Sequence, residues 1–269
     1  MADAFDRARF AAHLATRRLG RTLIARAEVE STNDVAWDAL MQDAPDGTTV
    51  VADVQTRGRG RQGRGWHTAP GRGLALSIAL VQGCERLQIG VLPLVAGLAL
   101  ARGLDGLGVA TRLKWPNDLL AGATGRKLSG ILCESRRLAN GDDAAVIGVG
   151  VNVSQSDEDF PTELRVTATS LAIEGRAADR ETVAAAFLNA LEPLWHVVQE
   201  GGREPVIAAW KERAAFWGEA VTVRTPSGPV TGVARDLDPS GALVLELAGG
   251  RRVTVWAGDL EAGPVEGRR

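Results

Sequence analysis

The stretch "TRGRGRQGRGW", Thr56–Trp66, alternates four arginines with four glycines. No acidic residue occurs between Val54 and Cys84, so this part of the chain is locally basic. Three functional interpretations compete: a disordered arm that binds nucleic acid, a dinucleotide-binding turn, and a loop that closes over some other phosphate compound. A solvated loop whose arginines have no chemical role is the fourth reading.

The runs on either side of this stretch read as strands. "TTVVADVQ" (48–55) and "LALSIAL" (74–80) are rich in β-branched and aliphatic residues, so the arginines lie in a connection within a sheet. Gly58, Gly60 and Gly63 satisfy GxGxxG, but a dinucleotide site also needs a helix to begin there. "RGWHTAPGRG" (64–73) contains a proline and three glycines and has no helical face, which disfavours that reading.

Outward from this loop, short β-branched runs alternate with alanine- and leucine-rich runs as far as residue 202. Ser31 or Thr32 is placed to cap the first of the helices. We expect strands over residues 21–29, 48–55, 74–80, 111–115, 127–135 and 144–153, and helices over residues 31–42, 87–107, 181–201 and 204–216. The alternation predicts an α/β catalytic domain, with a mixed β-sheet and flanking helices, over residues 1–216.

The pattern changes near residue 217. Four short strand-like runs, over residues 219–225, 228–238, 241–248 and 251–260, are divided by SG, PSG and GG turns. Four such strands in about fifty residues predict a small SH3-like β-barrel, which we assign to residues 217–269.

Composition limits the function. The 269 residues include 31 basic and 33 acidic ones, and the net charge of −2 argues against a protein dominated by nucleic-acid binding. Cys84 and Cys133 stand far apart, so we expect two reduced core thiols rather than a disulfide framework or a zinc site. Without a signal peptide or a clean membrane span, we expect a soluble, cytoplasmic protein.

Five motifs follow one another along the chain. They are "STND" (31–34), "QTRGRGRQGRGW" (55–66), "KWPNDL" (114–119), "GRKLSGILCE" (125–134) and "GVGVNV" (148–153). In this order they resemble the biotin protein ligases, and the resemblance runs from about Thr22 to Asp259. It implies a fold like that of the class II synthetase-like biotin and lipoate ligases. Since "STND" is reached after thirty residues, we expect the monofunctional type, without an N-terminal DNA-binding domain.

The resemblance implies a two-step reaction. Biotin and ATP form biotinyl-5′-AMP and pyrophosphate, and a lysine of a biotin carboxyl carrier protein then displaces AMP. Phosphoryl transfer depends mainly on positioning and on stabilising charge, and arginine suits both tasks by its planar, bidentate guanidinium. The arginine-glycine loop is thus expected to order over the acyl-adenylate and exclude water.

The resemblance also assigns residues. It implies catalytic roles for Arg61, Lys127 and Asp118. It implies biotin contacts from Ser31, Thr32, Gln55, Gly58, Arg59, Gly60, Arg61, Trp66, Lys127 and Gly130. It implies ATP contacts from Arg59, Arg61, Asn117, Asp118, Lys127 and Asn152. Pro116 is expected to fix a turn that displays Asn117 and Asp118 at its tip.

Cofactors and partners follow from the same resemblance. Biotin and Mg²⁺-ATP are the expected substrates, with Asp118 helping to orient the magnesium or the incoming amine, although no metal-ligand cluster is evident. The carboxylase carrier is the expected partner, a homodimer remains open, and DNA and membrane are not expected. A lipoate or octanoate ligase is the alternative within the superfamily, and a nucleic-acid-binding protein is the alternative from another class.

Overall fold

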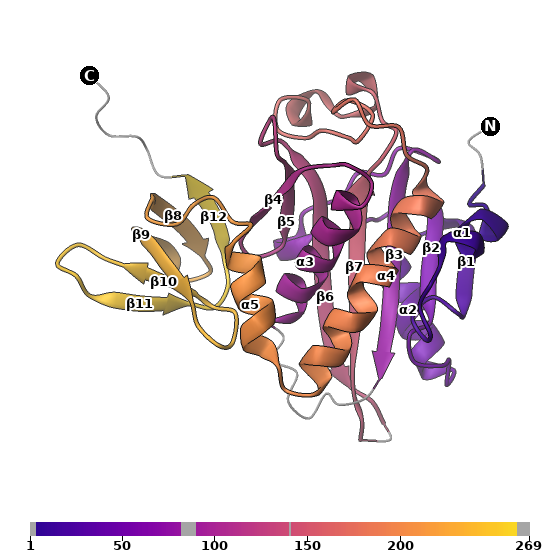
Figure 1. The fold of residues 1–269 in the computed structure, drawn as a ribbon, viewed down its shortest axis with the longest axis horizontal. Coiled ribbons are helices and arrows are strands. Elements are labelled where there is room, and N and C mark those ends of the chain that lie inside the picture. The colour runs from indigo at the N-terminus through magenta and orange to yellow at the C-terminus, as the bar shows by residue number, and fades with distance from the viewer. Residues whose placement is uncertain (1–3, 82–89, 140, 263–269) are drawn as a thin grey trace.

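The computed structural model describes residues 4–81, 90–139 and 141–262. Cys84 and the start of the expected helix 87–107 lie outside these residues. The elements of the first part of the chain form one sheet with helices packed on it (Figure 1).

The large sheet has seven strands in the order β1-β2-β3-β7-β6-β5-β4. β1 and β2 are parallel and every other neighbouring pair is antiparallel, so the sheet is mixed, as predicted. The strands are β1 (Leu23–Val29), β2 (Thr49–Gln55), β3 (Gly73–Val81), β4 (Thr111–Lys114), β5 (Asp118–Ala121), β6 (Lys127–Arg137) and β7 (Asp143–Asn152).

The two faces of the central strands carry side chains of different size. On β3, Leu74, Leu76, Ile78 and Leu80 alternate with Ala75, Ser77 and Ala79, because successive side chains of a strand point to opposite faces. β7 repeats this pattern, with its glycines on the small-residue face. One face is therefore lined by large aliphatic side chains and the other by small ones.

Helices cover both faces unequally. Figure 1 shows α3 (Leu92–Asp105), α4 (Arg180–Gln199) and α5 (Arg203–Lys211) together on the near side of the sheet, where they bury the large aliphatic residues. α1 (Arg7–His13) packs against α4. The opposite face receives α2 (Thr32–Met41), which buries Trp37 and Leu40 against β2, β3 and β7. Within residues 4–81, 90–139 and 141–262, part of the small-residue face is thus left without a helix.

The C-terminal part forms a second sheet, which lies at the left of Figure 1. Its order is β11-β10-β9-β8-β12 and all its pairs are antiparallel. The strands are β8 (Ala220–Thr225), β9 (Gly228–Leu237), β10 (Leu243–Glu246), β11 (Arg252–Val255) and β12 (Asp259–Ala262). The prediction of four strands was wrong by one, because residues 251–260 divide into β11 and the start of β12.

The two sheets share one hydrophobic core. Trp210 of α5 and Phe216 are buried in the same cluster as Val221 and Val223 of β8. The indole Nε1 of Trp115 donates a hydrogen bond of 3.0 Å to the carbonyl of Gly241, in the β9–β10 connection. Because the core is continuous, the division into domains at residues 216 and 217 stays a prediction.

Two local expectations were wrong, and one helix was missed. Asp118 is the first residue of β5, a strand that the sequence did not predict, and is not at the tip of a turn. The short helix α1 was also missed. Ser31 occupies the N-cap position of α2, but its side chain makes no capping hydrogen bond.

No helix among the described residues is long and apolar enough to cross a lipid bilayer.

A buried ion pair ties β2 to α4. The Arg180 Nη1 lies 2.7 Å from the Asp53 carboxylate, which also accepts a hydrogen bond of 3.1 Å from the Phe5 amide. The side chains of Asp53 and Arg180 are 13% and 6% exposed, so the charges are held largely away from water. This carboxylate thereby joins the N-terminal segment, the sheet and α4.

Asp53→Ala should destabilise the fold, because it removes the acceptor for two buried donors. Losing one partner of a buried ion pair typically costs about 3 kcal/mol or more. The measurement is urea unfolding followed by circular dichroism, with the exposed Asp38→Ala on α2 as the control. Equal unfolding midpoints for the two variants would show that the Asp53 carboxylate does not stabilise the fold.

Candidate active site

A cavity of about 580 Å³ opens on the small-residue face, next to the N-terminal end of α2. Its size is that of a pocket for a small organic ligand. The predicted site residues that line it are Ser31, Thr32, Gln55, Arg59, Gly60, Arg61, Trp66, Asn117, Asp118, Lys127, Gly130 and Asn152. Gly58 alone among the predicted site residues does not line it. Motifs far apart in sequence therefore meet in one place.

Glycines form the floor of this cavity. A Cβ on Gly150 would lie 2.3 Å from Trp66 Cε2, and one on Gly130 would lie 3.1 Å from Trp66 Cζ3. A Cβ on Gly148 would lie 2.2 Å from Asn33 Oδ1. Since Cβ atoms essentially never come within 3.0 Å of another atom, the absence of side chains at Gly148 and Gly150 of β7 is what admits Asn33 and Trp66, and Gly130 of β6 gives the indole further room.

One end of the cavity is a buried polar network around the start of α2. Gln55 Oε1 accepts hydrogen bonds from the Thr32 amide at 2.9 Å and from the Thr32 hydroxyl at 3.1 Å. The Ser77 hydroxyl lies 2.7 Å from Thr32 Oγ1 and 2.6 Å from Asn33 Oδ1. Ser31 is also buried, and its hydroxyl is not used in capping. Hydrogen-bonding groups are thus held rigidly next to the cavity.

The arginine-glycine loop is a compact hairpin-like turn. The Gly60 amide donates to the Arg64 carbonyl at 2.7 Å, and the Trp66 amide donates to the Gly58 carbonyl at 2.8 Å. Gln62 and Gly63, at φ values of 56° and 72°, form the tip in the left-handed region, as a type I′ turn requires. A Cβ on Gly58 would lie 2.5 Å from the Trp66 carbonyl oxygen, so this glycine serves packing within the loop.

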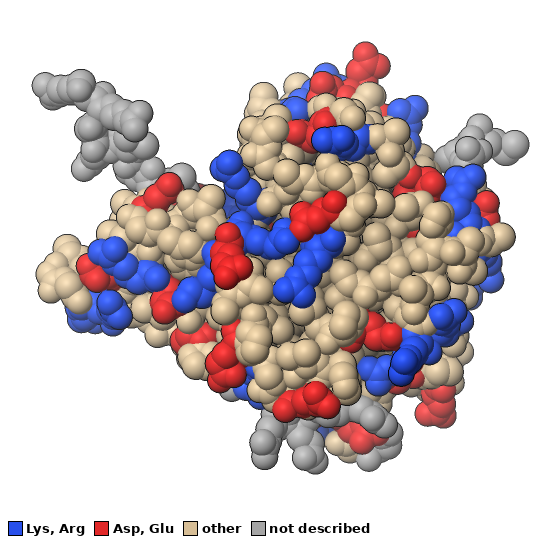
Figure 2. All heavy atoms as spheres, viewed as in Figure 1, with Lys and Arg blue, Asp and Glu red and all other residues tan. Residues whose placement is uncertain are grey.

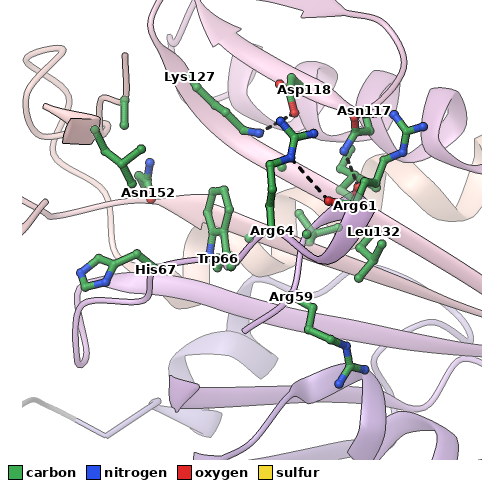
Figure 3. A pocket seen from close by; sticks show the side chains of 18 of the residues that line it. Arg59, Arg61, Arg64, Trp66, His67, Asn117, Asp118, Lys127, Leu132 and Asn152 are labelled. Atoms are coloured by element: carbon green, nitrogen blue, oxygen red, sulfur yellow. Dashed lines mark hydrogen bonds and ion pairs between the residues drawn. The ribbon is translucent and has the colours of Figure 1, made fainter. Parts of the chain in front are cut away.

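Arg59 is held at the side of the cavity. It makes a bidentate pair with Asp34 of α2, with distances of 2.7 and 2.6 Å, and lies 3.9 Å from Glu134. The hydrogen bonds to Asp34 raise the pKa of Arg59 and lower that of Asp34. Figure 3 shows its guanidinium pointing away from Lys127 and Asp118.

Arg61 and Arg64 lie at the other side of the loop. The Arg61 Nη1 donates to the carbonyl of Gly258 at 3.0 Å and to Asn117 Oδ1 at 3.4 Å. Burial lowers the pKa of Arg61, against the attraction of Asp259 and Asp118. Arg64 pairs with Asp259 at 2.6 Å. Residues of the C-terminal sheet therefore contact the loop.

Lys127 and Asp118 face each other across neighbouring strands β6 and β5, with 2.6 Å between Nζ and Oδ1 (Figure 3). The ammonium also lies 5.9 Å from the Trp66 ring centroid, within the range of a cation–π contact. Asp118 is the one carboxylate among the described residues that line the cavity. The cationic end of the cavity thus begins at Lys127 of β6, next to the Trp66 indole.

Two predicted asparagines are largely engaged in the framework. Asn117 Nδ2 donates to the Ile131 carbonyl at 2.8 Å, which ties the turn before β5 to β6. Asn152 Nδ2 donates to the Thr169 carbonyl at 2.9 Å, and its Oδ1 accepts from Gln155. Asn152 thereby braces the segment after β7, which closes one wall of the cavity through residues 160–168.

Sequence reasoning missed several contributors. Asn33 was quoted within "STND", but its contact with Glu134 at 3.0 Å depends on the pairing of distant strands. Arg64 and Asp259 were not assigned a site role, and their pairing has no sequence signal. No group of three or more His, Cys, Asp or Glu gathers as metal ligands in the described part of the chain.

Comparison with known families agrees with this geometry. Residues 25–152 match the model of the "Biotin/lipoate A/B protein ligase family", and residues 216–261 match the "Biotin protein ligase C terminal domain". The first match contains most of β1, all of β2 to β7 and most of the cavity, and the second contains β8 to β11 and the start of β12.

Individual relatives extend the match to nearly the whole chain. The chain is 39% identical to the biotin--[acetyl-CoA-carboxylase] ligase of Mycobacterium tuberculosis over 249 residues, 89% of this chain and 88% of the relative. It is 36% identical to the ligase of the same name from Paracoccus denitrificans over 237 residues, which are 84% of this chain and 95% of the relative.

A solved structure shows the same fold. The biotin protein ligase from Aquifex aeolicus, in complex with biotin and ATP, superposes with a TM-score of 0.75 at 29% identity, covering 90% of this chain and 98% of the other. With the family models and the relatives taken together, this chain belongs to the biotin protein ligases, within the biotin/lipoate protein ligase family.

Proposed function

We propose that this enzyme uses ATP to activate biotin as biotinyl-5′-AMP and transfers the biotinyl group to a lysine of a biotin carboxyl carrier protein. One observation carries the proposal. A single cavity joins a neutral hydrogen-bonding end, at the buried Ser31 and Thr32 and the partly buried Gln55, to a cationic end at Lys127 and Arg61. A ligand with a ureido head and an acidic tail matches this polarity.

The ureido ring of biotin fits the neutral end of the cavity. Ser31, Thr32 and Gln55 supply donors and acceptors for the ureido ring, and buried groups of this kind strongly discriminate against ligands that leave them unpaired. The floor at Gly130 and Gly150, with the Trp66 indole, suits the apolar ring and chain. The biotin carboxylate would then lie toward Lys127.

Charge stabilisation accounts for the cationic end. In the first step the biotin carboxylate attacks the α-phosphorus of ATP and pyrophosphate leaves. In the second a carrier lysine amine attacks the mixed anhydride and AMP leaves. Negative charge develops on phosphate oxygens in both steps, and Lys127 and Arg61 are the cations that we assign to offset it. Arg59, engaged by Asp34, is assigned to hold the loop.

Asp118 has three roles in this proposal. Its carboxylate fixes the Lys127 ammonium, and it is the cavity-lining acid that would meet the incoming carrier amine. Mg²⁺ commonly binds through one or two carboxylates together with substrate phosphates. Asp118 with the ATP phosphates fits that pattern, and the metal would supply further charge neutralisation. Asn117 and Asn152 would place backbone and amide groups near the nucleotide.

The arrangement of charge speaks against the nucleic-acid alternative. Arg57, Arg59 and Arg64 each form an ion pair, with Glu30, Asp34 and Asp259 respectively. The helix-covered face drawn in Figure 2, which is opposite the cavity, also carries interspersed basic and acidic side chains. A nucleic-acid surface instead gathers uncompensated positive charge.

Pairing of two copies of the chain stays a prediction.

The proposed substrate is tested by calorimetric titration with biotin and, separately, with lipoate, each followed by Mg²⁺-ATP and detection of pyrophosphate. We expect binding and pyrophosphate release with biotin, because the polar end matches its ureido ring. Addition of a carrier domain should then yield a product heavier by one biotinyl group. Release with lipoate alone would assign the enzyme to the sister ligases.

Lys127→Ala should slow biotin-dependent pyrophosphate exchange by about 10²–10³-fold, as is typical when one electrostatic group of a transition state is removed. The matched control is Lys211→Ala, which breaks an ion pair with Asp236 far from the cavity. A rate for Lys127→Ala within about twofold of the control would remove Lys127 from the chemistry.

Gly150→Ala should weaken biotin binding by about tenfold, since overpacking on the floor displaces the Trp66 indole. In a Trp66→Ala background the same change should cost less than about twofold, because the clash is gone. Calorimetry on the four proteins of this double-mutant cycle gives the coupling. An equal loss in both backgrounds would contradict the floor model.

A further inference from the structure

The C-terminal sheet contacts the arginine-glycine loop where β12 begins, at Gly258 and Asp259. We propose that Asp259, at the start of β12, is a positioning residue that orients Arg61 and Arg64, so that the C-terminal sheet completes the active site. The consequences for activity rest on the proposed ligase function, whereas the structural claim does not.

Three contacts connect the sheet to the loop. The Arg64 Nη2 lies 2.6 Å from Asp259 Oδ1, and the Arg61 Nη1 lies 4.0 Å from the same oxygen. The Arg61 Nη1 also donates to the Gly258 carbonyl at 3.0 Å. Asp259, the first residue of β12, and Gly258, which directly precedes it, thus receive Arg61 and Arg64.

The position of these acceptors is fixed by the sheet. Asp259 pairs with Arg224 in the β12–β8 ladder, so its backbone cannot shift without breaking the strand pair. Gly258 has a φ of 151°, and a Cβ there would lie 2.7 Å from the Arg224 carbonyl oxygen. Only glycine permits so close an approach to β8, which brings the carbonyl of residue 258 to Arg61.

Burial makes Arg61 depend on the carboxylate, whereas the side chain of its neighbour Arg64 is 61% exposed. The side chains of Arg61 and Asp259 are 20% and 22% exposed, so water screens them incompletely. Arg64 repels Arg61, while Asp259 attracts it. Removing the charge of Asp259 therefore leaves two like charges close together with weaker compensation, and the loop should open to separate them.

The loop is held from two sides. Asp34 of α2 binds Arg59 on one side, and Asp259 of β12 binds Arg64 on the other. The polar end at Ser31, Thr32 and Gln55 makes no contact with β12 among the described interactions. Loss of Asp259 should thus affect steps that need Arg61 more than it affects the recognition of biotin.

The test compares Asp259→Asn with Glu261→Gln. Both replace a strand β12 carboxylate by its amide, but Glu261 pairs with Arg224 at 2.7 Å and not with the loop. Asparagine keeps the shape of the side chain, which protects the fold, and thermal unfolding confirms that both variants are folded. Trypsin then probes the loop, because it cleaves after arginines in mobile backbone.

Without any ligand, cleavage within residues 57–64 should be about tenfold faster in Asp259→Asn than in the wild type, because a charge-assisted bond is lost. Glu261→Gln should stay within about twofold of the wild type. Mass spectrometry identifies the cleavage sites. Equal cleavage rates in the two variants would overturn the proposal.

The activity arm separates this proposal from the proposed function. In Asp259→Asn, biotin-dependent pyrophosphate exchange should fall about tenfold, while the Kd for biotin changes less than about threefold. Asp259→Glu should restore much of the exchange, since long arginine side chains can reach the displaced carboxylate. A uniform loss of biotin binding, exchange and thermal stability would instead indicate a purely structural role.

A wild-type protein without biotin-dependent exchange would refute the proposed function, yet the trypsin arm would still decide whether Asp259 holds the loop. An active wild type whose Asp259→Asn variant exchanges normally and resists trypsin would refute the positioning role alone.

Discussion

The absence of side chains at Gly130, Gly148 and Gly150 is the constraint on which the rest of the site depends. The opposite face of the same strands is filled by large aliphatic residues under α3 and α4. The sheet is thereby held rigidly from one side while the other side remains shallow enough for Trp66, Asn33 and a ligand. Rigid strands beneath a site preserve the geometry of the groups above it. The cavity is thus a product of strand alternation and not of a special loop alone.

The loop and the C-terminal sheet add what the strands cannot supply. The arginines of the site sit on a turn, and a turn by itself fixes arginine side chains poorly because each has many rotamers. Asp34 from α2 and Asp259 from β12 bind two of these arginines, and Asp118 fixes Lys127. Each important cation therefore has a carboxylate partner on a regular element. A phosphate-bearing ligand must compete with these carboxylates, which favours ligands that carry several negative charges over those with one.

Much of the fold followed from the sequence, because β-branched runs and alanine-rich runs alternate clearly and their periods differ. The mixed sheet, the principal helices and an all-β C-terminal part were predicted, and the family was confirmed. The errors have local causes. β5 is four residues long and follows Pro116, so turn signals masked it; β11 and β12 were merged because Gly258 was read as part of a strand. Pairings such as Arg64 with Asp259 cross from one sheet to another, and no local pattern encodes them.

The ion pair between Lys127 and Asp118 bears on whether the enzyme acylates its own lysine side chains. The sequence holds three lysines, at positions 114, 127 and 211, beside a much larger number of arginines. An acyl-adenylate reacts with amines, and guanidinium groups are far poorer nucleophiles at neutral pH because they stay protonated. Lys127 and Lys211 are each engaged in an ion pair, with Asp118 and Asp236 respectively. Lys114 lines the cavity and has no ion pair among the described residues, so it is the side chain on which self-acylation of this protein would concentrate.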